Sequence, residues 1–138
     1  LEFAQARGVP VLIHTFMRTG GNLPGELSPV DIVYLAQRYP DLRIIMAHLG
    51  GNWTRGVRQI APYPNVYTDC SGARAYQGCI EHAVAEVGAH RLLYGSDAFL
   101  RAFAGQLAKV VGAEIPLEAK RRILYTNSAA LFFGEGQP

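Results

Sequence analysis

Short apolar runs alternate along the chain with longer stretches that have the period of a helix. Four runs have the length of a strand, at residues 9–13, 42–47, 65–68 and 91–96. The segments 11–13 and 44–46 are apolar without interruption, which is typical of strands buried on both faces of a parallel sheet. The pattern predicts an α/β fold in which helices cover such a sheet.

The stretch that precedes the second run contains the clearest helix start. Ser28 offers a capping hydroxyl, Pro29 suits the first helical position, and Asp31 favours the positive end of the helix dipole. Pro40 ends this helix at about residue 39. Further helices are expected at 1–7, 54–61, 80–87, 99–110, 116–125 and 128–133, the last of them capped by Asn127.

The order of strands and helices leaves two architectures, a doubly wound open sheet or a (β/α)8 barrel. The chain lacks the G-x-G-x-x-G motif expected after the first strand of a dinucleotide-binding sheet. All four apolar runs instead end in His or Asp, and barrel enzymes place reactive side chains at the carboxyl ends of several strands. Because a complete barrel needs about 200–250 residues, four such units in 138 residues predict half a barrel.

Composition excludes several other classes of protein. The chain is 49% hydrophobic, which excludes disorder, and it has no apolar run long enough for a membrane span. Its 13 basic and 11 acidic residues are scattered apart from one cluster at 120–122, so neither nucleic acid nor membrane is an expected partner. Two cysteines and no targeting segment indicate a cytoplasmic protein. The first helix begins at the first residue, which indicates a sequence cut from a longer one.

Three residues carry the strongest chemical signal. His14, His48 and Asp97 each follow a predicted strand, so their side chains are expected to converge at one edge of the sheet. Two imidazoles and a carboxylate suit a Zn²⁺-like cation with one open position. Such a metal activates a water molecule, Asp97 can take its proton, and His48 can stabilise the developing oxyanion.

Each candidate also has a structural interpretation. A histidine at a strand end, such as His14, is often structural, and Asp69 and Asp97 can each cap the helix that follows. Cys70 is interpreted as core packing rather than as a metal ligand or nucleophile. His82 and His90 are interpreted as structural or solvated. Arg18 and Arg55 are candidates for holding a substrate carboxylate, with a solvated surface position as the alternative.

Four segments together resemble a known family: residues 10–15, 43–51, 92–97 and 123–132. They are similar to the second half of an amidohydrolase-related metal-dependent hydrolase, in the branch that includes the aminocarboxymuconate-type and salicylate-type decarboxylases. The resemblance extends over residues 9–134. It implies a single domain over residues 1–138 that is the C-terminal half, strands five to eight, of a metal-dependent hydrolase TIM barrel.

The resemblance also implies roles for individual residues. His14 would be a metal ligand at the end of strand five. His48, at the end of strand six, would be a second metal ligand or the acid/base group beside the metal-bound water. Asp97, at the end of strand eight, would be both ligand and proton acceptor, whereas Asp69 at the end of strand seven has no fixed role. The implied cofactor is a divalent metal, with zinc expected.

The sequence departs from the family in lacking the His-x-His pair of its first strand, as it lacks strands one to four. The expected function is metal-dependent hydrolysis of a small amide, ester or lactone by an activated water. Alternatives are non-oxidative decarboxylation of an aromatic or enol carboxylate at the same site, or a non-catalytic half-barrel. The expected macromolecular partner is a second copy of the chain or the missing N-terminal half.

Overall fold

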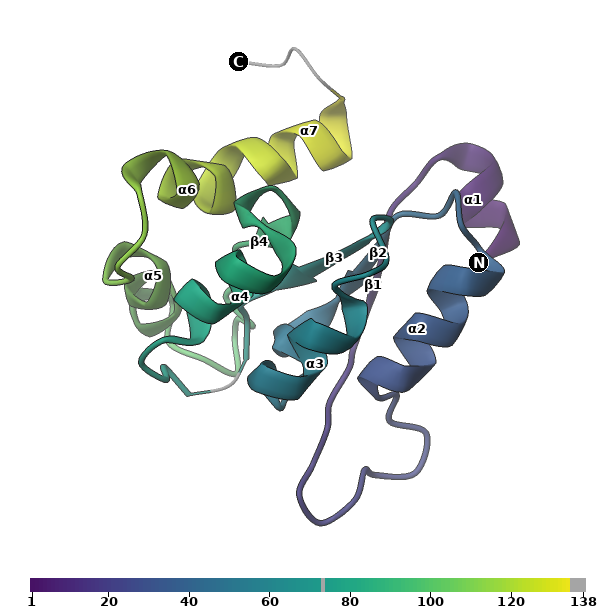
Figure 1. Ribbon diagram of the computed structural model, residues 1–138, viewed down its shortest axis with the longest axis horizontal. Helices are drawn as coiled ribbons and strands as arrows, with labels where there is room; N and C mark the ends of the chain where they lie inside the picture. The colour runs from purple at the N-terminus through teal and green to yellow at the C-terminus, as the bar shows by residue number, and fades with distance from the viewer. Residues whose placement is uncertain (73, 135–138) are drawn as a thin grey trace.

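The computed structural model describes residues 1–72 and 74–134 and contains one parallel sheet (Figure 1). Its strands lie in the order of the sequence: β1 (Val11–Ile13), β2 (Ile44–Met46), β3 (Val66–Asp69) and β4 (Leu92–Leu93). Leu12, Ile45 and Tyr67 are register partners across the first three strands. The parallel sheet confirms the α/β prediction, although β1, β2 and β4 are shorter than the apolar runs that predicted them.

Helices follow every strand. They are α1 (Glu2–Arg7), α2 (Pro29–Arg38), α3 (Trp53–Ile60), α4 (Cys79–Val87), α5 (Phe103–Val111), α6 (Leu117–Arg121) and α7 (Asn127–Phe133). Short 3₁₀ turns occupy η1 (Ala47–Gly50) and η2 (Ala89–Arg91), and a π-helical turn, η3 (Arg122–Thr126), joins α6 to α7. The α2 start agrees with the sequence, since the Asp31 carboxylate accepts hydrogen bonds from the Ser28 amide and hydroxyl. No helix in the described ranges is long and apolar enough to cross a bilayer.

The main core lies between the sheet and the helices α2, α3 and α4 (Figure 1). Ile44 and Met46 of β2 are fully buried there, against side chains such as Ile32, Ile60 and Ile80 from the three helices. Burying one such side chain stabilises the fold by about 1.5–3 kcal/mol. This packing fixes where the strands end, and hence where the residues that follow them lie.

The opposite face of the sheet is covered only in part. Ile45 and Leu93 are buried on this face by Leu131 of α7, together with Tyr67. Leu12, the register partner of Ile45, is 61% exposed. The face that bears Leu12, Ile45 and Leu93 is therefore covered by α7 near β4 and open along β1.

Buried polar side chains hold the amino ends of the strands. Arg91 donates to the carbonyl oxygens of Ala61, Tyr63, Val66 and Val87. Asn65 donates in the same way to three carbonyls at the end of α2 and in the following turn. These hydrogen bonds satisfy carbonyls that would be costly to leave buried without a partner.

Two details of the predicted helices are wrong. Phe99 is fully exposed and α5 begins only at Phe103, because the preceding segment folds back in a turn in which the Leu100 amide bonds to the Asp97 carbonyl. Asn127 does not cap a helix, since the chain is already helical before it. Its amide instead donates to the carbonyls of Ala89 and Leu92, which ties α7 to the start of β4.

Candidate active site

The four residues that end the apolar runs lie at the carboxyl edge of the sheet. Asp69 is the last residue of β3, and His14, His48 and Asp97 follow the other three strands. All four line one hollow of about 410 Å³. Ser71 and Gly95 contribute to the same wall. The sequence pattern therefore identified the histidines and carboxylates of this hollow, although it did not single out Ser71 and Ser96.

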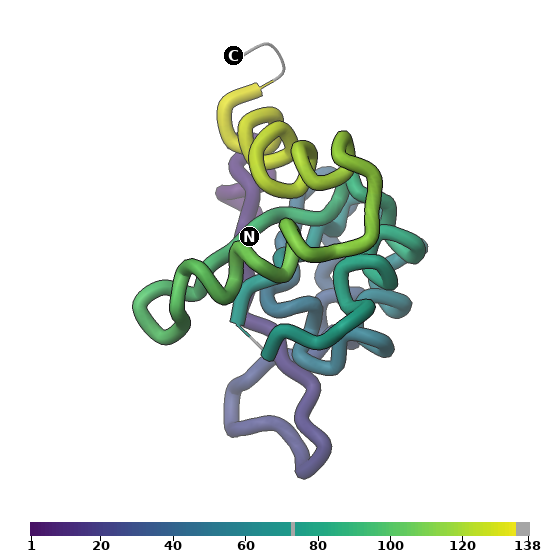
Figure 2. The backbone as a smooth tube through the Cα atoms, turned by 90° about the vertical axis from the view of Figure 1, so that its left-hand side faces the viewer, coloured from purple at the N-terminus to yellow at the C-terminus, as the bar shows by residue number. Residues whose placement is uncertain are grey.

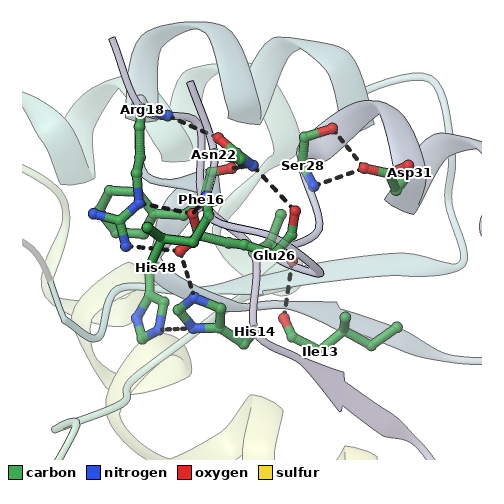
Figure 3. A network of polar contacts seen from close by, with 11 residues as sticks. Ile13, His14, Phe16, Arg18, Asn22, Glu26, Ser28, Asp31 and His48 are labelled. Atoms are coloured by element: carbon green, nitrogen blue, oxygen red, sulfur yellow. Dashed lines mark hydrogen bonds and ion pairs between the residues drawn. The ribbon is translucent and has the colours of Figure 1, made fainter. Parts of the chain in front are cut away.

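The two histidines are in direct contact (Figure 3). His14 Nδ1 lies 3.1 Å from His48 Nε2, and the two ring planes are inclined at 68°. On its other side, His14 Nε2 lies 3.1 Å from the Glu26 carboxylate. Each imidazole is thus placed by the chain itself and does not depend on solvent for its orientation.

Glu26 was not predicted from the sequence. It lies in the long segment between β1 and α2, which extends away from the rest of the molecule (Figure 2). Its side chain is only 6% exposed and accepts two hydrogen bonds from Arg18, at 2.7 and 2.8 Å. These bonds, with those from His14 and the Leu23 amide, lower the pKa of Glu26 to about 2. The signal available in the sequence is that Glu26 is the only acidic residue between 15 and 28.

His48 is held by the loop that follows β3. Its Nδ1 lies 2.8 Å from Ser71 Oγ, and its backbone amide donates to Asp69 Oδ1 at 3.1 Å. His48 has a φ of 61°, a conformation that non-glycine residues adopt only when their surroundings enforce it. Gly72 packs so closely on the imidazole that a Cβ there would collide with Nδ1.

The positions of the ring protons follow from these contacts. Ionised Glu26 can only accept, so His14 Nε2 must donate to it. With one N–H on each ring, His14 Nδ1 then accepts from His48 Nε2, and His48 Nδ1 accepts from the Ser71 hydroxyl. Because a hydroxyl can donate or accept, Ser71 also suits the other tautomer of His48, in which Nε2 has a free lone pair.

The histidine pair fits two neighbouring positions around a divalent cation. Nitrogen ligands about 2.0–2.1 Å from zinc in a tetrahedral site lie about 3.3 Å apart, close to the observed 3.1 Å. Glu26 behind His14 is the carboxylate partner that metal-bound histidines commonly have. Two nitrogen ligands are nonetheless an incomplete set.

Asp97 lines the same hollow from the segment after β4. It has a φ of 53°, and its Oδ2 lies 3.8 Å from Arg101 Nε. Within residues 1–72 and 74–134, no three His, Cys, Asp or Glu side chains are grouped closely enough to hold a metal ion. The structure therefore joins His14 to His48 and places Asp97 in their hollow, and the binding of metal by the three residues stays a prediction.

The remaining candidates have structural surroundings. Asp69 is not a helix cap, because its Oδ1 accepts from the amides of His48 and Ser71. Cys70 is buried without a disulfide, and this burial raises the pKa of its thiol to about 11. His82 packs edge-on against Trp53, and His90 lies in the turn before β4.

Comparison of the sequence with protein families decides the family. The model of the family described as amidohydrolase matches residues 1–134. The chain belongs to the amidohydrolase family. A comparison of the sequence with curated proteins finds no match.

Solved structures with this fold include several members of the amidohydrolase family. A dihydroxybenzoic acid decarboxylase from Polaromonas with bound manganese has a TM-score of 0.72 and 21% identity, covering 95% of this chain and 52% of that one. An amidohydrolase from Burkholderia multivorans with bound zinc has a TM-score of 0.70 and 16% identity, over 94% and 54% of the two chains. A TIM-barrel protein from Bordetella bronchiseptica has a TM-score of 0.72 and 19% identity, over 94% and 47%.

The chain spans about half the length of the solved structures that it matches. Its four parallel strands with their helices therefore have the fold of part of an amidohydrolase-family TIM barrel. At these identities the likeness concerns the fold alone. Activity, metal and substrate have to be argued from the residues of this chain.

Proposed function

We propose that the chain is the C-terminal half, strands five to eight, of a metal-dependent hydrolase of the amidohydrolase family. The observation that carries the proposal is the contact between His14 Nδ1 and His48 Nε2, with Glu26 behind one ring and Ser71 behind the other. This arrangement brings one nitrogen of each ring within 3.1 Å of the other and holds each ring by a second side chain on its opposite side.

In this proposal His14 and His48 hold a divalent cation, zinc being the metal that two imidazoles and an open position suit. When bound, the metal supplies Lewis-acid polarisation of a carbonyl and a water of lowered pKa. Manganese in the Polaromonas enzyme and zinc in the Burkholderia protein support a divalent metal in general. The ligands still needed are proposed to be Asp97 and groups from outside this chain.

The chain's own residues have distinct proposed roles. Asp97 accepts a proton from the attacking water, because its carboxylate lines the same hollow as the histidines. In the alternative role, as the acid/base group beside the metal and not as a ligand, His48 is placed to move a proton, since Ser71 can bond to Nδ1 whether that atom carries a proton or not. The hollow of about 410 Å³ suits a small amide, ester or lactone.

Decarboxylation is the second candidate, because the Polaromonas relative is a decarboxylase. The same residues would then promote loss of CO₂ from an aromatic or enol carboxylate, with His48 as the acid/base group, not a metal ligand, placed to deliver a proton to the carbon. A third candidate is a half-barrel that binds its partner without catalysis.

The test is an assay of the whole protein, with the proposed N-terminal half present, after zinc supplementation or chelator treatment, on esters, lactones, amides and aromatic carboxylates in ¹⁸O-labelled water. Zinc-dependent product that contains ¹⁸O supports the hydrolase. Release of CO₂ without ¹⁸O in the organic product overturns it in favour of the decarboxylase. No turnover of any substrate by zinc-loaded protein favours the non-catalytic half-barrel.

Asp97→Asn tests the proposed proton acceptor. The substitution keeps the size of the side chain and removes its basicity, so we expect the activity of the whole protein to fall at least about 100-fold with the fold retained. Asp41→Asn, which changes an exposed acid between α2 and β2, is the matched control. Activity of Asp97→Asn within about threefold of the unchanged protein would contradict this role.

A further inference from the structure

Two polar side chains of α5 are buried next to the loop that follows β3. Gln106 is 6% exposed and Lys109 is 9% exposed, although glutamine and lysine are mostly exposed in proteins. The two residues are separated by one helical turn, so they lie on the same face of α5. Neither lines the hollow that contains the histidines. The reason for their burial therefore has to be found outside that hollow.

Both side chains donate hydrogen bonds to backbone carbonyls of the loop. Lys109 Nζ lies 3.0 Å from the carbonyl oxygen of Cys70, and Gln106 Nε2 lies 3.1 Å from that of Gly72. The two bonds therefore hold the backbone on either side of Ser71. A helix that is packed on the core in this way fixes the position of a loop that has no regular structure of its own.

The amide of Gln106 keeps an unsatisfied acceptor. Its Oε1 is buried and has no hydrogen-bond partner among the described residues. The reverse orientation of the amide would place Oε1 against the carbonyl oxygen of Gly72, and both of these atoms can only accept. A buried acceptor without a partner is costly, and an apolar side chain of the same length would avoid that cost. The bond to the Gly72 carbonyl is therefore what a glutamine provides at this position.

The same loop holds His48. Ser71 Oγ lies 2.8 Å from His48 Nδ1, and a Cβ on Gly72 would collide with that nitrogen. Asp69 Oδ1 accepts hydrogen bonds from the amides of both Ser71 and His48. Gly95 adds a further constraint, because a Cβ there would lie only 2.8 Å from the Cβ of Ser71. The loop thus connects α5 to the imidazole, with little room to move between them.

We propose that Gln106 and Lys109 are positioning residues that act on His48 through the loop at 69–72. Because they hold the backbone on either side of Ser71, they keep the Ser71 hydroxyl within hydrogen-bond distance of His48 Nδ1. That bond keeps the imidazole in the orientation in which Nε2 faces His14. The consequence for catalysis rests on the proposed function. The effect on the His48 ring does not, and it can be measured without metal or substrate.

The experiment records ring ¹⁵N spectra of the histidine-labelled, chelator-treated whole protein, with the proposed N-terminal half present. His48→Gln identifies the His48 resonances by their loss. Gln106→Met and Lys109→Met each keep the approximate length of the side chain and remove the donor. In both variants we expect the Nδ1 resonance of His48 to move toward that of a solvated imidazole. The ring resonances of His90, in the turn before β4, are expected to stay in place.

Kinetics on a substrate found by the hydrolase assay provide a second readout. We expect kcat of Gln106→Met to fall about tenfold with KM unchanged, because a displaced acid/base or ligand group slows the reaction more than it weakens binding.

Val110→Ala is the matched control. Val110 lies on α5 and is fully buried in the core, so its truncation loosens the packing of the helix without removing a hydrogen bond to the loop. We expect the His48 resonances and kcat of this variant to stay unchanged.

Three outcomes would overturn the proposal in whole or in part. Unchanged His48 resonances in both Gln106→Met and Lys109→Met would contradict it, and a shift in only one of them would remove the role of the other residue. If one variant does not fold, the other decides. An equal shift in Val110→Ala would reduce the effect to a general loosening of α5. Shifted resonances in a protein without zinc-dependent hydrolysis would contradict the proposed function and support the positioning of His48.

Discussion

His14 Nδ1 lies 3.1 Å from His48 Nε2, and a different partner fixes each ring from behind. Glu26, itself held by Arg18, orients His14, and Ser71 orients His48. The two rings come from the ends of neighbouring strands, whose register brings Ile13 beside Met46. The pair is therefore a product of the parallel sheet and of two loops that meet above it.

Glu26→Gln tests the support behind His14. The amide can still bond to His14 but no longer has the charge that pairs with Arg18 and selects the His14 tautomer. We expect zinc affinity to fall about 10–100-fold, the usual effect of losing such a partner. Competition with a chromophoric chelator measures it. The control is Glu86→Gln on α4, which removes a comparable ion pair with Arg58 of α3. An equal loss of zinc affinity in both variants would contradict the account.

Gly72→Ala tests the close packing on His48. Gly72 has a φ of 74°, and a Cβ there would collide with the imidazole. We expect the free energy of unfolding to fall by about 1–3 kcal/mol and the His48 ring resonances to shift. Gly105→Ala, in α5 with open space around the new methyl group, is expected to be neutral or slightly stabilising. Equal free energies of unfolding for the two variants in chemical denaturation would show that the packing of Gly72 on His48 leaves room for a methyl group.

The two buried thiols predict that the stability of the fold decreases at alkaline pH. Burial raises the pKa of Cys70 to about 11 from its ordinary value of 9.0, and burial raises the pKa of Cys79 as well. Between pH 9 and pH 11 the Cys70 thiol loses its proton in the unfolded chain and keeps it in the folded chain. The free energy of unfolding therefore falls as the pH rises from 9 toward 11.

At pH 8 we therefore expect neither thiol to react rapidly with a disulfide reagent in the folded protein. Both should react once the chain is unfolded in denaturant. A fast-reacting thiol in the folded protein would contradict the burial of these side chains.

Much of the fold could be predicted because its signals are local. Uninterrupted apolar runs marked the strands, and Ser28 with Pro29 marked the start of α2. The errors lie where tertiary contacts decide, as for Asn127, whose amide bonds to carbonyls 35 and 38 residues away in the sequence. An asparagine before an apolar helix resembles a cap unless those carbonyls are known.

The same limit applies to the candidate site. His14, His48 and Asp97 follow strands, so position along the chain revealed them. Glu26 and Ser71 lie in loops without periodicity, and only the folding of those loops brings them onto the histidines. The contact between the two imidazoles likewise depends on side-chain orientation, which the order of residues does not give.

Self-association is predicted from the open face along β1. Leu12 is 61% exposed and Val9 is 51% exposed beside a strand whose outer edge is available for pairing. We expect the isolated chain to form dimers or larger species in sedimentation experiments, and Leu12→Lys to shift it toward monomer. Leu117→Lys changes an apolar side chain that is 82% exposed on α6 and is the control. A monomer at all concentrations would contradict this prediction.

The central claim is that His14 and His48 together hold a divalent cation, and a calorimetric zinc titration of three proteins tests it most directly. The chain is expected to bind one zinc ion weakly, because it supplies only part of a ligand set. His14→Ala is expected to abolish this binding. His90→Ala, which removes an imidazole from the turn before β4, is expected to leave it unchanged. Zinc binding by His14→Ala that equals that of the unchanged chain would contradict the claim.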